Sequence, residues 1–278
     1  MLQQLLHNKV LLNKKQALSK RLFLFEPMQN TLSIIYRDDY LIAINKPSGL
    51  LVHRSAIDKH ETRFAMQMLR DQIEQHVFPV HRLDKPTSGV LVFALSSEIA
   101  AAMGNIFTAH NLKKTYLAIV RGCVPEYQLL SYPLLEELDK YTDKNARNPE
   151  PKTAITEFFR LADIELPHQI DKYPHSRYSL VKCLPQTGRK HQIRRHLKHL
   201  SHPIIGDAKH GKGNHNRFFQ HTFDAHRLLL AATELEFAHP VLNTDIKITA
   251  PLDETMTQLI QRFNWYNAIP PTWLVPSL

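Results

Sequence analysis

The chain has 278 residues, of which 43% are apolar and 22% charged, and it carries a net charge of +9 with a pI near 9.5. This composition is typical of a globular protein with a sizeable core, and two cysteines exclude both a disulfide framework and a four-thiolate zinc site. We therefore expect a reducing compartment, the cytoplasm. No apolar run approaches the roughly 18–20 residues that span a bilayer, so we expect no membrane partner.

Residues 1–30 are predicted to be a basic N-terminal extension, with a short helix from Leu2 to Phe25, and residues 31–278 to be one main domain. Strands outnumber helices in this domain without a strict βαβ alternation, which predicts an α+β fold. In chain order we expect strands over 32–36 and 40–45, a helix over 62–75, a loop over 81–88, a buried strand over 89–95, a helix from its N-cap Ser97 to about 108, a strand over 114–121, an exposed loop over 136–152, strands over 154–161 and 178–184, a helix over 189–200, a loop over 207–222, strands near 234–237 and 245–249, and a helix over 254–263.

Two stretches carry the whole positive excess. Residues 1–30 have a net charge of +4 and residues 186–227 a net charge of +7, so the rest of the chain is slightly acidic. Such clustering at a pI above 9 is typical of proteins that bind a polyanion, and a solvated basic face without a partner is the plainer alternative.

The helix predicted over 189–200 carries part of this charge on one side. Steps of 100° per residue place Ile193 and Leu197 on one face. If that face docks on the core, the helix presents a row of cations to whatever lies opposite it, which suits a phosphate or a carboxylate. The cations of this row are His191, Arg194, Arg195 and Lys198.

A short loop before the buried strand carries the strongest chemical signal. The segment HRLDKPTSG, residues 81–89, places Asp84 between Arg82 and Lys85 in a loop bounded by proline and glycine. Neighbouring cations favour the ionised carboxylate, which is the form that a nucleophile needs. A loop carboxylate in surface ion pairs is the alternative, and such pairs stabilise a protein by only about 0–1 kcal/mol.

Four segments in this order resemble the RluA-type pseudouridine synthases. HRLDKPTSGVLVFA resembles the catalytic motif of that family, and DDYLIAINKPSGLLVH (38–53), KKTYLAIVRG (113–122) and TGRKHQIRRHLKHLSHPIIGD (187–207) resemble its other motifs. The resemblance implies an α+β pseudouridine synthase fold, with a mixed, mostly antiparallel sheet, flanking helices and a central RNA-binding cleft. It makes residues 31–278 the catalytic domain of an isomerase, and it implies no metal ion and no organic cofactor.

The resemblance also implies a role for several side chains. Asp84 is the expected nucleophile, Tyr116 the proton acceptor that lies against the target base, and Arg194 the cation paired with Asp84. Arg82 is expected to fill the place of the flipped base, because a base inside a helix must leave the stack before an enzyme can reach it. Charge adds further RNA-binding candidates, namely His81, Arg189, Lys190, Arg195, Lys198, Lys209, Lys212 and Arg217.

Several other stretches resemble the bacterial members of the family that modify uridine 65 of tRNA. They cover residues 51–61, 69–89, 131–140 and 194–217. The expected partner is therefore tRNA, and no feature of the sequence calls for an obligate protein partner.

Three alternatives stay open from the sequence. The same motifs occur in synthases that modify ribosomal RNA, and an inactive RNA-binding module would share the basic surface. A metal-dependent phosphoesterase is suggested by the histidines that crowd residues 191–226, although their spacing crosses the expected end of a helix and carboxylates are scarce there. Those histidines are His196, His199, His202, His210, His215, His221 and His226.

Overall fold

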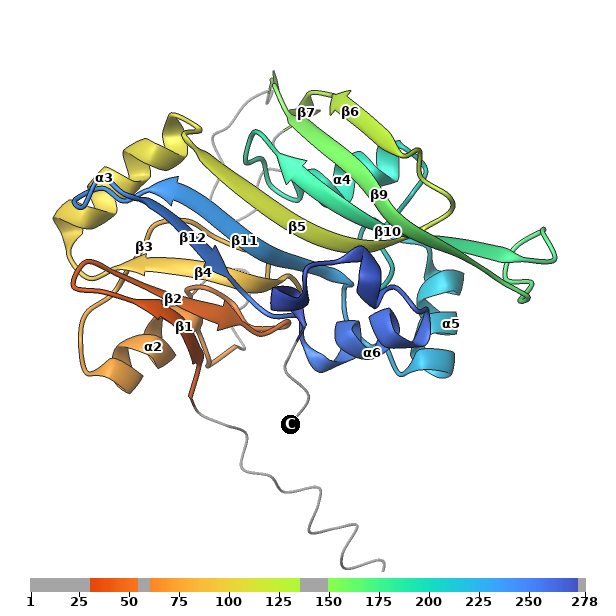
Figure 1. The fold of residues 1–278 in the computed structure, drawn as a ribbon, viewed down its shortest axis with the longest axis horizontal. Helices are drawn as coiled ribbons and strands as arrows, with labels where there is room; N and C mark the ends of the chain where they lie inside the picture. Colours follow the sequence, from red (N-terminus) through yellow and green to blue (C-terminus); the bar gives the residue numbers. More distant parts are fainter. Residues whose placement is uncertain (1–30, 55–60, 136–149, 275–278) are drawn as a thin grey trace, which may run out of the picture.

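A computed structural model describes residues 31–54, 61–135 and 150–274. The helix expected over Leu2–Phe25 and most of the loop expected over 136–152 lie outside these residues. Between them, the described residues form a curved sheet with helices on both sides (Figure 1).

Ten strands form the main sheet. The chain of neighbours runs β1-β2-β4-β11-β5-β10-β9-β6, with β12 beside β11 and β3 beside β4. Only the β4–β11 pairing is parallel among the pairings of these strands. The strands are β1 Ser33–Arg37, β2 Leu41–Lys46, β3 Phe78–Pro79, β4 Ser88–Ala94, β5 Leu112–Arg121, β6 Tyr127–Ser131, β9 Ile155–Leu166, β10 Ser176–Pro185, β11 Leu230–Ala238 and β12 Asp245–Thr249, and a separate pair joins β7 Leu134–Leu135 to β8 Pro151–Lys152. The expected α+β class with a mixed, mostly antiparallel sheet is confirmed.

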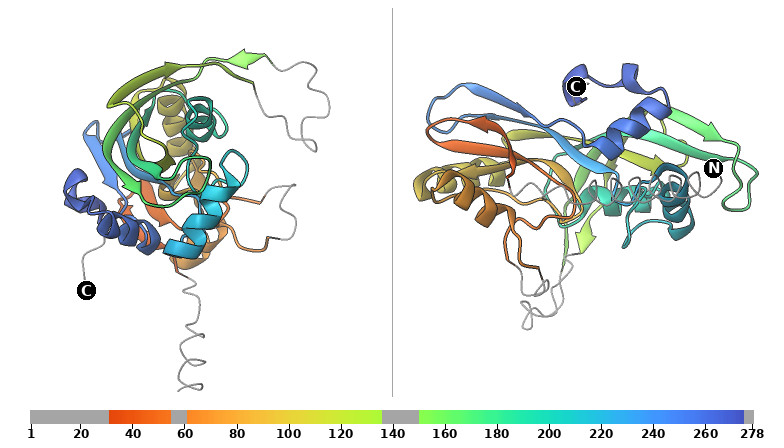
Figure 2. Two further views of the ribbon diagram at one scale, coloured as in Figure 1. Left: turned by 90° about the vertical axis from the view of Figure 1, so that its right-hand side faces the viewer. Right: turned by 90° about the horizontal axis from the view of Figure 1, so that it is seen from below.

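Five helices accompany the sheet in the described residues, and those at the centre lie on opposite faces. On β5, Leu117 and Ile119 pack with α6, whereas Ala118 and Val120 pack with α4, because successive side chains of a strand point to opposite faces. Figure 2 shows α6, in dark blue, and α4, in teal, on the two sides of the sheet. The helices are α2 Ala65–Ile73, α3 Ser97–Thr108, α4 Gln192–His199, α5 Gly213–Phe223 and α6 Glu254–Arg262.

Two details of the expected elements were wrong. The loop expected over 207–222 contains α5, because its aromatic residues Phe219 and Phe223 pack against Phe263 and against each other. This tertiary packing outweighs the poor helix propensity of a stretch rich in glycine, histidine and asparagine. The N-cap of α3 is Ser96 and not Ser97, since the Ser96 hydroxyl accepts the backbone N–H of Ile99. Strands β3, β6 and β7 were not expected, and β8 lies at the end of the loop expected over 136–152.

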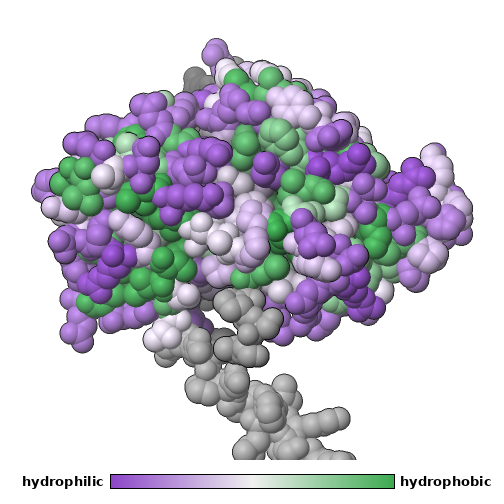
Figure 3. All heavy atoms as spheres, in the orientation of Figure 1, coloured by the Kyte–Doolittle hydropathy of each residue, from purple (hydrophilic) through white to green (hydrophobic). Residues whose placement is uncertain are grey.

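One face of the molecule is mostly polar. Figure 3 shows polar residues spread over the face of Figure 1, with apolar residues in small groups between them. No helix among the described residues is long and apolar enough to cross a membrane.

The parallel contact between β4 and β11 depends on a glycine. Gly89 has φ +110°, and a Cβ there would lie 2.0 Å from the carbonyl oxygen of Ala232. We predict that Gly89→Ala lowers the free energy of unfolding by at least about 3 kcal/mol, through backbone strain and overpacking.

Urea denaturation checks this value against Gly104→Ala as a matched control. Gly104 lies in α3, and a methyl group added there would have no neighbour within 4 Å, so this change should stabilise the protein by about 0.5–1 kcal/mol. Equal denaturation midpoints for the two variants would show that the close approach of the strands is relaxed in solution.

Candidate active site

The loop between β3 and β4 is held on both sides of Asp84. Leu83 is buried in the core beside α2, and the N–H of Thr87 donates to the carbonyl of Asp84 to close a turn. Asp84 itself keeps 21% of its side chain exposed. The loop therefore has a fixed backbone that presents one carboxylate to solvent.

A buried lysine ties this loop to the turn after β2. Lys46 is fully buried, and its Nζ donates to the carbonyl oxygens of Pro47, Leu50 and Lys85 at 2.9, 2.8 and 3.1 Å. Burial, together with the nearby Arg227, lowers the pKa of Lys46 to about 7, while the charge of Asp84 opposes this shift. The side chain of Lys46 thus joins the segment 38–53 to the HRLDKPTSG segment.

Arg194 joins Asp84 to a second carboxylate. Its Nη1 donates to Oδ2 of Asp84 at 3.0 Å, while its Nε and Nη2 donate to the two oxygens of Asp207 at 2.7 and 2.9 Å. The Arg194 side chain is 7% exposed and that of Asp207 is fully buried. Two carboxylates therefore share one guanidinium, and a bidentate pair of this kind fixes its plane.

Asp207 has further donors around it. Its Oδ1 also accepts the backbone N–H groups of Lys209 and His210, both at 2.9 Å. Burial by itself raises the pKa of Asp207, but the hydrogen bonds from Arg194, His210 and Lys209 outweigh burial and hold the pKa below its usual value. Asp207 was not among the site residues expected from the sequence; its position at the end of the segment TGRKHQIRRHLKHLSHPIIGD (187–207), 13 residues after Arg194, was the available signal.

Two histidines extend the cluster behind Asp84. His191 places its Nε2 3.8 Å from Oδ1 of Asp84, and its Nδ1 lies 3.2 Å from Nε2 of His210. His191 caps α4 with a left-handed backbone, φ 56°, a conformation that is rare outside glycine and is concentrated at functional sites.

Tyr116 lies on β5, where the core beside α2 meets the core beside α4. Burial raises the pKa of its hydroxyl, and the charge of Asp84 raises this pKa further. The Tyr116 hydroxyl is therefore protonated at neutral pH, and the Asp84 carboxylate lies within electrostatic range of it.

His81, expected as an RNA contact, lies at the start of the Asp84 loop and packs against α3. Its ring stacks on Phe107 with the centroids 4.9 Å apart, and its Nε2 accepts the N–H of Val92 at 3.0 Å. Burial, together with the charge of Lys114, lowers the pKa of His81 to about 3. The ring is neutral at pH 7, so it holds the loop and brings no positive charge to RNA.

The remaining candidates differ in how far they reach into solvent. Arg82, Lys198 and Lys209 are exposed, as are Lys212 and Arg217. Three half-buried residues join them, of which Arg189 donates to the carbonyl of Thr153, Arg195 donates to that of Leu135, and Lys190 lies next to His191. Lys209 also donates its backbone N–H to Asp207, so one of the exposed cations begins at the edge of the buried cluster of Asp84, Arg194 and Asp207.

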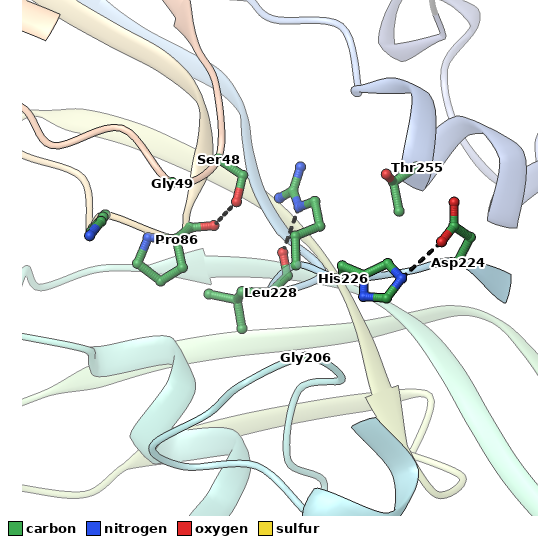
Figure 4. Close-up of a pocket in the computed structure, with 10 residues that line it drawn as sticks. Ser48, Gly49, Pro86, Gly206, Asp224, His226, Leu228 and Thr255 are labelled. Carbon is green, nitrogen blue, oxygen red and sulfur yellow. Dashed lines mark hydrogen bonds and ion pairs between the residues drawn. The ribbon is translucent and has the colours of Figure 1, made fainter. Parts of the chain in front are cut away.

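A hollow adjoins the Asp84 loop on the side of α6 (Figure 4). It has a volume of about 500 Å³, which lies within the usual range of ligand pockets. Lys85 and Pro86 form one wall, and Gly206, His226 and Leu228 lie across from them. Asp84, Tyr116 and Arg194 do not line it, so the hollow lies beside the carboxylate of Asp84 and does not contain it.

Comparisons with known proteins place this site in a family. Residues 40–199 match the family model of RNA pseudouridylate synthases. A protein of Vibrio parahaemolyticus named tRNA pseudouridine synthase C is 55% identical over 84% of this chain and 96% of its own length, and a protein of the same name from Pasteurella multocida is 51% identical over 84% and 97%.

The chain belongs to the RNA pseudouridylate synthase family. Two solved human structures share its fold. RNA Pseudouridylate Synthase Domain Containing 1 is 24% identical with a TM-score of 0.62 over 86% of this chain and 98% of that one, and Domain Containing 4 is 25% identical with a TM-score of 0.62 over 84% and 93%. The family and the isomerase class expected from the four motifs are confirmed.

The histidines that suggested a phosphoesterase serve other purposes in this RNA pseudouridylate synthase. His196 bonds Thr156 and the carbonyl of Tyr132, and His202 bonds the carbonyl of Arg121. Within residues 31–54, 61–135 and 150–274, no three histidine, cysteine or acidic side chains are grouped to hold a metal ion. Family membership and these contacts leave the phosphoesterase alternative without support.

We predict that Asp207→Asn lowers turnover at least tenfold with RNA affinity changed less than threefold, because Arg194 loses the carboxylate that orients it toward Asp84. Stability should fall by about 3 kcal/mol, since a buried charge loses its partner. Single-turnover kinetics and urea denaturation check both effects. Asp163→Asn, which removes an exposed ion pair with Arg160, is the control and should change stability by less than about 0.5 kcal/mol.

The difference in stability between wild type and Asp207→Asn should depend on pH. The folded-state pKa of Asp207 is depressed, so its contribution is fully present above the ordinary pKa of about 3.9 and is lost as the pH falls through the folded-state value. The denaturation curves of wild type and Asp207→Asn should therefore be well separated at pH 7 and should approach each other as the pH falls to about 3. A constant difference would contradict the assignment.

Proposed function

We propose that this protein is a tRNA pseudouridine synthase that converts uridine 65 of tRNA to pseudouridine. The observation that supports it most is the carboxylate of Asp84, held by a guanidinium that Asp207 fixes, in a chain of the RNA pseudouridylate synthase family. The relatives named tRNA pseudouridine synthase C support tRNA as the substrate, and the resemblance of residues 51–61, 69–89, 131–140 and 194–217 supports uridine 65.

In the proposed reaction Asp84 is the nucleophile. Arg194 holds Oδ2, so Oδ1 is the oxygen that attacks the nucleotide. Breaking the bond between N1 and the ribose and joining C5 to the same ribose carbon isomerises the uridine. The base loses a proton at C5 and gains one at N1, so the reaction needs no external oxidant, reductant or group donor.

The target base must leave its helix before Asp84 reaches it. Unstacking costs a few kcal/mol, and we propose that the exposed guanidinium of Arg82 fills the space that the base leaves. Tyr116 places its ring against the uracil. Because its hydroxyl is protonated at rest, it accepts the proton from C5 only while its own proton passes to another group.

The exposed and half-buried cations near α4 are proposed to hold the tRNA backbone. Arg189, Lys190, Arg195, Lys198 and Lys209 would neutralise phosphates, which makes affinity fall as salt rises. The cytoplasm is the proposed compartment, since both cysteines, Cys123 and Cys183, are free thiols. A ribosomal RNA substrate is the second candidate, supported by motifs that the two kinds of synthase share.

We predict that Asp84→Asn abolishes pseudouridine formation and leaves tRNA affinity within a few-fold of wild type. Asparagine has the size of aspartate but lacks the charge that a nucleophilic carboxylate requires. Turnover is measured by tritium release from C5-labelled tRNA, and affinity by filter binding. Any turnover above background in the pure variant would remove Asp84 from the mechanism.

The substrate is tested by mapping modified positions. Incubation of the enzyme with unmodified tRNA transcripts and with ribosomal RNA fragments, followed by carbodiimide mapping, should show pseudouridine at tRNA position 65. Modification of ribosomal RNA alone would replace the proposed substrate but keep the proposed chemistry. The Asp84→Asn protein is the matched control for both substrates.

A further inference from the structure

The outer face of α4 leads from the reactive carboxylate to an exposed aromatic pair. At 100° per residue, Arg195, Lys198 and His199 lie side by side on the face of α4 opposite its buried residues, and Arg194 lies at the edge of the buried face next to Lys198. Lys198 and His199 are exposed and Arg195 is half-buried. His199 follows Arg194 by five positions, a rise of about 7.5 Å along the helix.

The aromatic pair consists of His199 and Tyr132, the residue after β6. Their rings stack with centroids 3.8 Å apart and an angle of 23° between the planes. Tyr132 keeps 40% of its surface exposed. The Tyr132 ring is stacked on His199, is partly open to solvent and lies near two cations. Sites that bind single-stranded nucleic acids combine aromatic rings and positive charge in this way.

The segment that carries Tyr132 is held firmly to α4. His196 lies 3.1 Å from the carbonyl of Tyr132, and Arg195 donates to the carbonyl of Leu135 at 2.8 Å. The ring is therefore preorganised, and stacking on it requires little ordering of the protein.

We propose that Tyr132, backed by His199, stacks an unpaired base of the RNA, with Arg195 and Lys198 holding the phosphates between that base and the reacting uridine. The inference rests on the proposed function for the direction in which the RNA runs.

The test compares Tyr132→Ala, Tyr132→Leu and Tyr132→Phe with wild type. Tyr173→Ala is the matched control, because Tyr173 is also exposed, beside Lys172, but lies outside the proposed RNA surface, between β9 and β10. Affinity for an unmodified tRNA transcript is measured by fluorescence anisotropy. Stacking is measured by the quenching of 2-aminopurine placed in a single-stranded RNA oligonucleotide.

We expect Tyr132→Ala and Tyr132→Leu to weaken tRNA binding about tenfold, which corresponds to about 1.4 kcal/mol, and to abolish the quenching. Tyr132→Phe should match wild type in both measurements, since it keeps the ring and lacks only the hydroxyl. Tyr173→Ala should also match wild type. Leucine keeps apolar bulk against His199, so a folded Tyr132→Leu protein separates stacking from a structural effect.

Two results would overturn the inference. One is wild-type affinity and quenching in a folded Tyr132→Leu protein, and the other is an equal loss in Tyr132→Phe. These measurements need no turnover, so they stand even if no pseudouridine forms in any tRNA. If wild type modifies tRNA and the Tyr132 variants bind it normally, the stacking site alone is wrong.

Discussion

One guanidinium shared by two carboxylates determines the rest of this site. Asp207 uses both oxygens to fix the plane of Arg194, and only Nη1 remains directed at Asp84. A buried ion pair is costly unless its remaining hydrogen-bonding groups are satisfied, and the backbone N–H groups of Lys209 and His210 meet this need at Asp207. The position of the Asp84 carboxylate therefore depends, through Arg194, on the loop that carries Asp207.

The loop that carries Asp207 is packed so closely that its backbone has little freedom to move. Gly206 precedes Asp207 with φ +80°, and a Cβ there would lie 1.9 Å from the carbonyl oxygen of Arg227. Its backbone N–H donates to Asn216 of α5. The helix that was expected to be a loop thus supports the carboxylate that orients Arg194, so the aromatic packing of α5 contributes to the geometry of the site.

The sequence predicts the loop of Asp84 and the charged face of α4, because both are local patterns. It does not predict by itself that Asp84 and Arg194, 110 residues apart, form a pair; the family resemblance implied that pairing. Asp207 and His81 were harder cases. Asp207 becomes important only through its fit to Arg194, and the charge of His81 depends on burial against Phe107, which no local pattern records.

The charges of this protein divide into two groups that respond differently to the solvent. Arg194, 7% exposed, acts at short range on Asp84 and is little affected by salt, because buried pairs are screened far less than exposed ones. Lys198 and Lys209 are exposed, so under the proposed function their contacts with RNA phosphates would weaken as salt rises. Ionic strength would therefore act on the binding of RNA and leave the orientation of the Asp84 carboxylate intact.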